Sequence, residues 1–177
     1  MNGSESGSKF YGKYRGTVIN NIDPQQMGRL QVECPDVLSL VPSSWAVPCV
    51  PLAGPTGTPM GVYLVPPIGA GVWIEFEQGD PDHPIWVGCR WGGQSDVPSL
   101  ALAGLPVSPS IVLQTMMQNT LQISDVPGPT GGFMLKCNSG AMILVNNIGI
   151  TITNGQGATI SMTGPTITMN EGALVVT

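Results

Sequence analysis

The sequence predicts an all-β protein with two unlike parts: an N-terminal five-stranded barrel of the OB type, and a C-terminal needle in which three chains wind into a triple-stranded β-helix, or β-prism. Three observations lead to this prediction. Apolar and polar residues alternate with a period of two in many short runs, as in half-buried strands. The 24 glycines and 17 prolines separate those runs without a regular repeat, as in turn-rich β proteins. Near residue 110 the charged and aromatic residues almost vanish, which marks a second kind of structure.

The clearest element of the first part is a hairpin expected within residues 69–93, GAGVWIEFEQGDPDHPIWVGCRWGG. Val72, Ile74 and Phe76 alternate with residues expected to point outward, and a second apolar run follows at 85–89. The Gly/Asp/Pro turn between the runs contains prolines, which have no N–H and keep the tip out of the strand ladder. Two strands alone are barely stable, so further strands must join them.

The preceding residues supply those strands. Alternation and proline placement predict further strands at 11–19, 28–34, 45–50 (an edge strand) and 63–65. Five or six strands in roughly 85 residues, without a convincing helix, suit a Greek-key barrel of OB type. We assign residues 10–93 to this barrel and the Gly/Ser-rich residues 1–9 to a flexible tail.

The second part is expected to be the needle, at residues 110–177, after a proline-stiffened linker at 94–109. Its apolar centres recur at intervals of roughly 7 to 11 residues, as in a short-strand repeat. Each unit offers two or three apolar side chains on one face, too few to bury alone, and three chains wound about one axis could place them in a shared dry interior. Eight or nine strands at about 4.8 Å each would make a needle roughly 40 Å long. The expected core residues of the needle are Ile148, Ile150, Ile152, Ile160, Met162, Ile167 and Met169.

The charge of the chain bounds its function. Only 10% of its residues are charged, against roughly 25% in ordinary domains, and we therefore expect an obligate oligomer. The net charge of −5 with six Lys and Arg argues against nucleic-acid binding, which needs a basic surface. Mean hydropathy is +0.20, yet no apolar run approaches the 18 or so residues of a membrane helix. The N-terminus lacks the apolar segment of a secretory signal, so we expect synthesis in the cytoplasm without a signal peptide.

Cysteine and histidine give little sign of a metal site. Cys34, Cys49, Cys89 and Cys137 have no CxxC spacing, and we interpret them as reduced, buried small hydrophobic residues. His83 is the only histidine, so zinc ligation is not expected.

Acidic and aromatic residues of the first part leave three alternatives open. Glu75 and Glu77 would lie about 7 Å apart on one strand face, a spacing compatible with a glycosidase pair; a solvated stripe is the simpler interpretation. Glu77, Asp80 and Asp82 have the oxygen ligands that calcium prefers, although a turn with solvated acids is commoner. The four tryptophans could form a carbohydrate-binding platform, which is the third alternative. We expect instead that they fill the barrel or face neighbouring subunits: Trp45, Trp73, Trp86 and Trp91.

These two parts, in this order, resemble the central spike proteins of contractile injection machines. This family includes baseplate assembly protein V of phages, the VgrG proteins of type VI secretion and the spikes of extracellular injection systems. Residues 15–35, RGTVINNIDPQQMGRLQVECP, are similar to the opening strands of the family's OB-fold, and residues 119–153 to the VgrG-type needle repeats. The resemblance covers about residues 12–177 and is strongest at 67–93. There the OB signature places Pro67, Gly69, Val72, Phe76, Glu77, Gly79, Asp80, Pro81, Pro84, Ile85 and Gly88.

The resemblance implies a structural, non-enzymatic homotrimer that punctures a membrane at the tip of a contractile tail or injection-system inner tube. Its OB ring would dock on a hub. VgrG proteins carry a hub domain ahead of the OB-fold, so a separate hub protein is expected here. The linker leaves no room for the lysozyme domain of some phage spikes. The His-x-His iron site of others has no counterpart, because no histidine follows His83; we expect neither a metal nor a cofactor.

The end of the needle is expected to carry a separate tip. The sequence finishes in GALVVT, which would leave strand edges open for pairing. A PAAR-like protein is the expected cap, on Leu174, Val175, Val176 and Thr177. Effector cargo, and the target cell envelope during injection, are further partners that the resemblance implies.

Two other function classes stay open at this point. A β-helical tailspike that binds or cleaves surface polysaccharide would need an aromatic and carboxylate groove along the needle. A nucleic-acid-binding OB-fold ranks third, because of the charge.

Overall fold

The computed structural model of the chain describes residues 8–54 and 57–176, with Val175 and Val176 described by their backbone alone. The chain divides into two compact units, residues 1–92 and 93–177. Most of the tail predicted at 1–9 lies outside the described residues. The finer boundaries of the barrel (10–93), the linker (94–109) and the needle (110–177) are still predictions.

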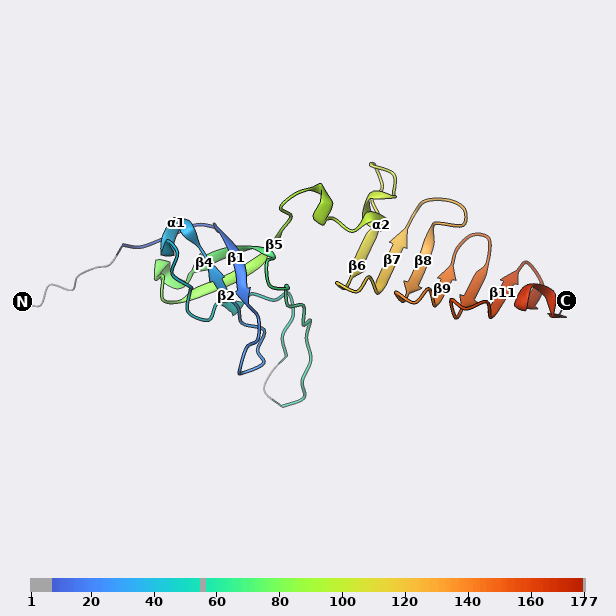
Figure 1. The fold of residues 1–177 in the computed structure, drawn as a ribbon, viewed down its shortest axis with the longest axis horizontal. Coiled ribbons are helices and arrows are strands. Elements are labelled where there is room, and N and C mark those ends of the chain that lie inside the picture. Colours follow the sequence, from blue (N-terminus) through green and yellow to red (C-terminus); the bar gives the residue numbers. More distant parts are fainter. Residues whose placement is uncertain (1–7, 55–56, 177) are drawn as a thin grey trace, which may run out of the picture. The chain divides into compact units, whose positions relative to one another are not determined.

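The first unit is a five-stranded sheet with the strand order β2-β1-β4-β5-β3 (Figure 1). Its elements are β1 (Tyr14–Asn20), β2 (Gln31–Glu33), the one-turn helix α1 (Pro35–Leu38), β3 (Val47–Pro48), β4 (Gly71–Phe76), a 3₁₀ turn (Glu77–Gly79) and β5 (Pro84–Arg90). The two edges of the sheet meet where Leu30 and Ala46 exchange both backbone hydrogen bonds, at 3.1 and 2.7 Å. This bridge joins the β2 side to the β3 side, so the sheet curls into a barrel.

The interior of the barrel follows the predicted alternation. In β4, Val72, Ile74 and Phe76 are buried while the residues between them are not. Val32 in β2 is buried in the same way. The complete buried cluster is Val18, Leu30, Val32, Cys34, Ala46, Val72, Ile74, Phe76 and Trp86. Period-two patterning therefore predicted the inward faces of these strands correctly.

The loop between β1 and β2 is fixed by a buried carboxylate. Asp23 accepts hydrogen bonds from the guanidinium of Arg29 and from the backbone amides of Gln25, Met27 and Arg29. The Arg29 guanidinium in turn lies 5.5 Å from the centre of the Trp45 ring. The hydrogen bonds to Arg29, followed by those to the amides, hold the pKa of Asp23 well below its usual range.

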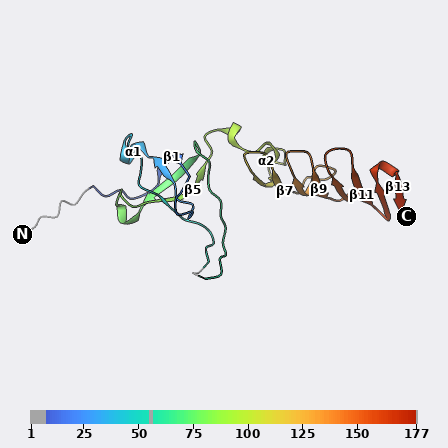
Figure 2. The same cartoon turned by 60° about the horizontal axis from the view of Figure 1, so that its bottom comes forward.

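The second unit is a single antiparallel meander. Its eight strands follow one another in chain order from β6 to β13 (Figure 1), and Figure 2 shows the same ladder turned by 60°. Its elements are a 3₁₀ turn (Gln94–Asp96), α2 (Ser99–Leu102), β6 (Ile111–Gln114), β7 (Thr120–Ser124), β8 (Gly132–Lys136), β9 (Met142–Val145), β10 (Ile150–Thr153), β11 (Thr159–Thr163), β12 (Thr166–Met169), a 3₁₀ turn (Asn170–Gly172) and β13 (Leu174–Val176).

Several predicted elements differ from the structure. Residues 63–65 form no strand; the nearest pairing is a single bridge between Ala53 and Gly61. The edge strand predicted at 45–50 shrinks to the two residues of β3, which pair in parallel with β5. Prolines limit this segment, because a residue without an N–H cannot donate to the ladder. Among the described residues the helices α1 and α2 have four residues each, and no helix is long and apolar enough to span a membrane.

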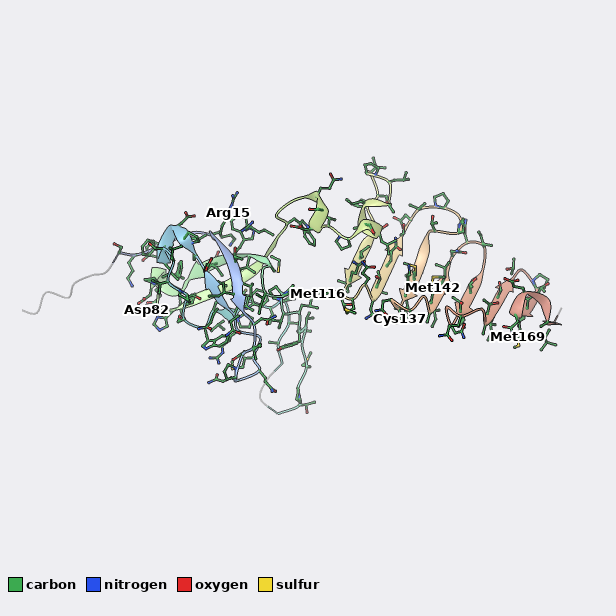
Figure 3. The ribbon with its side chains drawn as sticks, viewed as in Figure 1. Arg15, Asp82, Met116, Cys137, Met142 and Met169 are labelled. Carbon is green, nitrogen blue, oxygen red and sulfur yellow. The ribbon has the colours of Figure 1, made fainter. Side chains whose placement is uncertain are left out.

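The cysteines also differ from their prediction. All four are free, but only Cys34 is buried, while Cys49, Cys89 and Cys137 are exposed (Cys137 is labelled in Figure 3). The interpretation as buried hydrophobic residues was therefore wrong for three of them.

Candidate self-association surface

One face of the second sheet carries two continuous rows of apolar side chains. Residues directly opposite one another on paired strands share a face, so the strand register places these rows. The first row is Ile111, Ile123, Phe133, Val145, Ile150, Met162 and Ile167. The second row is Leu113, Leu121, Leu135, Ile143, Ile152, Ile160, Met169 and Leu174. We call these two rows the apolar ladder; each strand from β6 to β12 contributes one residue to each row.

The apolar ladder is uncovered in the single chain. Ile111 is 65% exposed, Phe133 59% and Leu135 53%, and the least exposed side chains of the ladder are half-buried. A shallow hollow at the strand ends is lined by ladder residues such as Leu121 and Leu135 together with residues outside the ladder such as Lys136. Monomeric proteins rarely expose a contiguous apolar patch of more than a few hundred Å². The ladder is therefore the surface of this unit that most needs a partner.

The opposite face of the sheet becomes polar along its length and is partly covered by the chain itself. In β10 to β12 this face includes Thr151, Ser161 and Thr168, at successive paired positions. At β7 the side chain of Gln122 is buried and donates from Nε2 to the carbonyl of Leu100 at 3.5 Å. The segment around α2 thus covers the back of the first strands and leaves the ladder side free.

This covering segment is the apolar SLALAGLPV of the predicted linker. Within it, α2 lies beside β6. Its side chains are only partly covered, since Leu102 and Leu105 are each 51% exposed and Val107 is 92% exposed.

Six of the seven residues predicted for the needle core lie in the apolar ladder: Ile150, Ile152, Ile160, Met162, Ile167 and Met169. Ile148 lies outside it and is 52% exposed. It belongs to the turn between β9 and β10, where Oδ1 of Asn146 accepts the backbone amides of Ile148 and Gly149 at 2.9 and 3.2 Å. The alternation of apolar residues continues from Ile148 to Ile150 in the sequence, but the strand begins only at Ile150, so Ile148 is a turn residue.

Sequence reasoning missed the ladder residues of β6 to β9. In β8 and β9 both faces are apolar, because Met134 and Leu144 occupy the face opposite to Phe133 and Ile143. The alternation that marks the later strands is therefore hidden in these two. The signal that would have found them is the spacing of the Gly- and Asn-rich turns, which sets the strand pairing.

The residues predicted for the tip interface are only partly described. Leu174 lies in β13, pairs with Met169 and is 53% exposed. The backbones of Val175 and Val176 pair with β12, their side chains are not described, and Thr177 lies outside the described residues.

The OB signature residues build the turn between β4 and β5. The backbone amide of Glu77 donates to the carbonyl of His83 at 2.9 Å, and Oδ1 of Asp80 accepts the amide of Asp82 at 3.1 Å. Gly79 has φ +75°, and a Cβ there would lie 3.0 Å from the Tyr11 ring, so only glycine suits this position.

The same turn holds the start of the barrel. The amide of Phe10 donates to the carbonyl of Gly79 at 2.9 Å, and the Phe10 ring lies 6.3 Å from that of Phe76. Pro84 is fully buried, and Gly88 pairs with Trp73 at an irregularity in the β4–β5 register.

The remaining signature residues lie around this hairpin. Val72 is part of the buried cluster, Ile85 pairs with Glu75, and the turn residue Pro81 follows Asp80. The carbonyl of Pro67 accepts the amide of Ala70, and the amide of Gly69 donates to Val18 in β1. The signature is thus explained by packing and turn geometry.

The acidic residues of the hairpin are arranged differently from the arrangement that the sequence predicted. Strand β4 ends at Phe76, so Glu77 follows the strand and does not share its face with Glu75. The Glu75 carboxylate accepts a hydrogen bond from the ammonium of Lys13. Asp80 Oδ2 lies 3.8 Å from the Lys9 ammonium, and the amide of Asp82, followed by the Lys9 charge, lowers the pKa of Asp80.

The four tryptophans have four different surroundings. Trp86 is buried and donates from Nε1 to the carbonyl of Gly28 at 3.0 Å. Trp45 lies beneath Arg29, the Arg15 guanidinium lies 6.0 Å from the Trp73 ring, and Trp91 is 64% exposed. Whether any of them face neighbouring subunits stays a prediction.

Comparison with known families places both units. Residues 14–91 match the type VI secretion system/phage-baseplate injector OB domain. Residues 110–175, which contain the whole apolar ladder, match the phage baseplate V C-terminal trimerisation domain. Comparison with curated proteins gives no match.

Proposed function

The chain belongs to the phage baseplate V family of baseplate spike proteins, and from this we propose that it acts as a homotrimeric, membrane-puncturing spike at the tip of a contractile tail or injection-system inner tube. Both matched families are structural baseplate components, and we propose a mechanical, non-enzymatic role. The observation that supports it most is the apolar ladder, which a single chain leaves open.

Three ladders facing one axis would form the shared core of a β-prism. Closing the trimer would bury on the order of 1,000 Å² of apolar surface per chain, more than the roughly 800 Å² per partner of a standard interface. The Thr- and Ser-bearing face of β10 to β12 would then point to water. A dry core of this kind supports the rigidity that a spike needs under axial load.

We propose a different partner for each end of the trimer. The OB units would form a ring that docks on a hub protein, and the end at β13 would carry a PAAR-like tip protein. Strand β13 closes the described sheet at that end, and an open edge strand is a template for pairing with another chain. Sheath contraction would drive the assembly, with effector cargo as an optional partner, through the target envelope.

Two experiments test this proposal. On denaturing gels the unheated protein should migrate as an SDS-resistant trimer and the boiled protein as a single chain, whereas a single chain in both lanes would contradict the shared core. Antibody labelling of intact particles should mark the baseplate end of the tail or injection tube. Labelling of the lateral fibres would instead favour a polysaccharide-binding tailspike.

A further inference from the structure

The first unit carries a second uncovered apolar surface, on the connection between β3 and β4. No residue from 37 to 74 is charged or a histidine, although charged residues are spread through the rest of this unit. Within this stretch we call residues 49–54 and 57–65 the arm. Figures 1 and 2 both show it running away from the barrel.

The arm has a defined base and a paired middle. At its start the amide of Cys49 donates to the carbonyl of Trp86 in β5, at 2.9 Å. Just beyond its end, Nδ2 of Asn21 donates to the carbonyl of Pro66 at 3.0 Å. Between these points the two limbs are joined by hydrogen bonds from Val62 to Leu52 (3.0 Å) and from Gly54 to Met60 (2.7 Å). The arm is thus a specific hairpin-like projection of the barrel.

Apolar side chains cover both limbs of the arm. Leu52 on the first limb is 48% exposed, and on the second limb Met60 is 57%, Tyr63 68% and Leu64 63% exposed. A hollow beside the arm extends this surface to Met27 of the β1–β2 loop. A protruding, charge-free segment with this many open side chains is a typical interaction surface.

We propose that the three arms of one trimer pack against one another. This inference rests on the proposed trimer, because the matched trimerisation domain would hold three copies of the arm at effective concentrations of about a millimolar. In a closed threefold ring each copy touches its two neighbours through two different surfaces. The arm meets this requirement, since both of its limbs carry apolar side chains. The arm carries no charge, and the arm of the next chain is an uncharged surface that matches it.

Photo-crosslinking in the full-length chain tests this inference. Tyr63 is replaced by p-benzoylphenylalanine, which keeps an aromatic ring at a position that is 68% exposed, and Tyr11, at 72%, receives the same replacement as a matched control. After irradiation the Tyr63 variant should give covalent dimers and trimers whose linked peptides lie within residues 49–65. The Tyr11 variant should give no link to those residues.

Native mass measured on the same samples separates the two proposals. A trimer without covalent products from position 63, or with products that map outside the arm, would overturn the packing of the arms and leave the surface for another protein such as the hub. A single-chain mass would overturn the trimer itself and the arm packing with it.

A pair of charge substitutions gives an independent readout. Leu64→Asp in the arm should raise amide hydrogen exchange across residues 57–65 at least tenfold while the native mass stays trimeric. Leu40→Asp, at a site outside the arm that is 85% exposed, should leave that exchange unchanged. Equal exchange in the two variants and the wild type would contradict the inference.

Discussion

A single charge on the apolar ladder should prevent the trimer from forming. Ile150 lies in the first row, between Val145 and Met162 on the neighbouring strands. Replacing it with Asp removes about 1.5–3 kcal/mol of apolar burial per chain. It also places a carboxylate without a partner in the shared core, which costs several kcal/mol. The total is about 5 kcal/mol per chain, or about 15 kcal/mol for three chains. A trimer that assembles in two nanomolar steps gains about 25 kcal/mol, so about 5 kcal/mol per step would remain, which is close to millimolar affinity.

Light scattering at micromolar concentration, coupled to size exclusion, measures the outcome. Ile150→Asp should have the mass of one chain, 18.5 kDa. The matched control is Thr151→Asp, which introduces the same charge one residue later on the opposite face, and it should stay trimeric. An Ile150→Asp protein that remains trimeric and SDS-resistant would refute the shared core.

The pH dependence of this variant has a definite sign. In a closed trimer burial would raise the pKa of the new carboxyl above the roughly 3.9 of an exposed Asp. The penalty is therefore complete above the raised pKa, shrinks as the pH falls from there to about 3.9, and is absent at lower pH, since the protonated acid carries no charge. Trimer should reappear as the pH is lowered from 7 towards 3.

Three further predictions concern the barrel. Asp23→Asn should lower the melting temperature and make it less dependent on acid pH. The depressed pKa of Asp23 gives stability that is present above about pH 4 and lost as the pH falls. Thermal melts from pH 3 to 7 measure this, with Asp36→Asn at an exposed site as the control. Leu30→Ala, at a fully buried site, should reduce the free energy of unfolding by about 2–5 kcal/mol in a denaturant titration, and an effect below 1 kcal/mol would contradict the barrel core. Gly79→Ala should cost about 1–3 kcal/mol in the same titration, because of its positive φ and the contact with Tyr11.

The barrel could be predicted from sequence because its strands alternate cleanly. Val72, Ile74 and Phe76 all point inward as expected, and the signature turn around Gly79 has a local stereochemical cause. The closing bridge between Leu30 and Ala46 could not be predicted, since it depends on how far the sheet curls.

The second unit shows where alternation alone does not identify the strand faces. In β10 to β12 alternating Ile or Met with Thr or Ser marks one face, and six predicted core residues lie on it. Leu144 and Met134 make both faces of β8 and β9 apolar, so alternation there cannot tell which side faces the ladder. The arm was missed because glycine and proline suggest an ordinary loop, and the exposure of Leu64 follows only from tertiary structure.

The native mass of the wild-type protein decides whether three chains share one core. Light scattering of the purified full-length chain should give three times 18.5 kDa, unchanged on dilution from high to low micromolar concentration. A mass of one chain over that range would leave the apolar ladder without a partner and contradict the account of a shared, trimeric core.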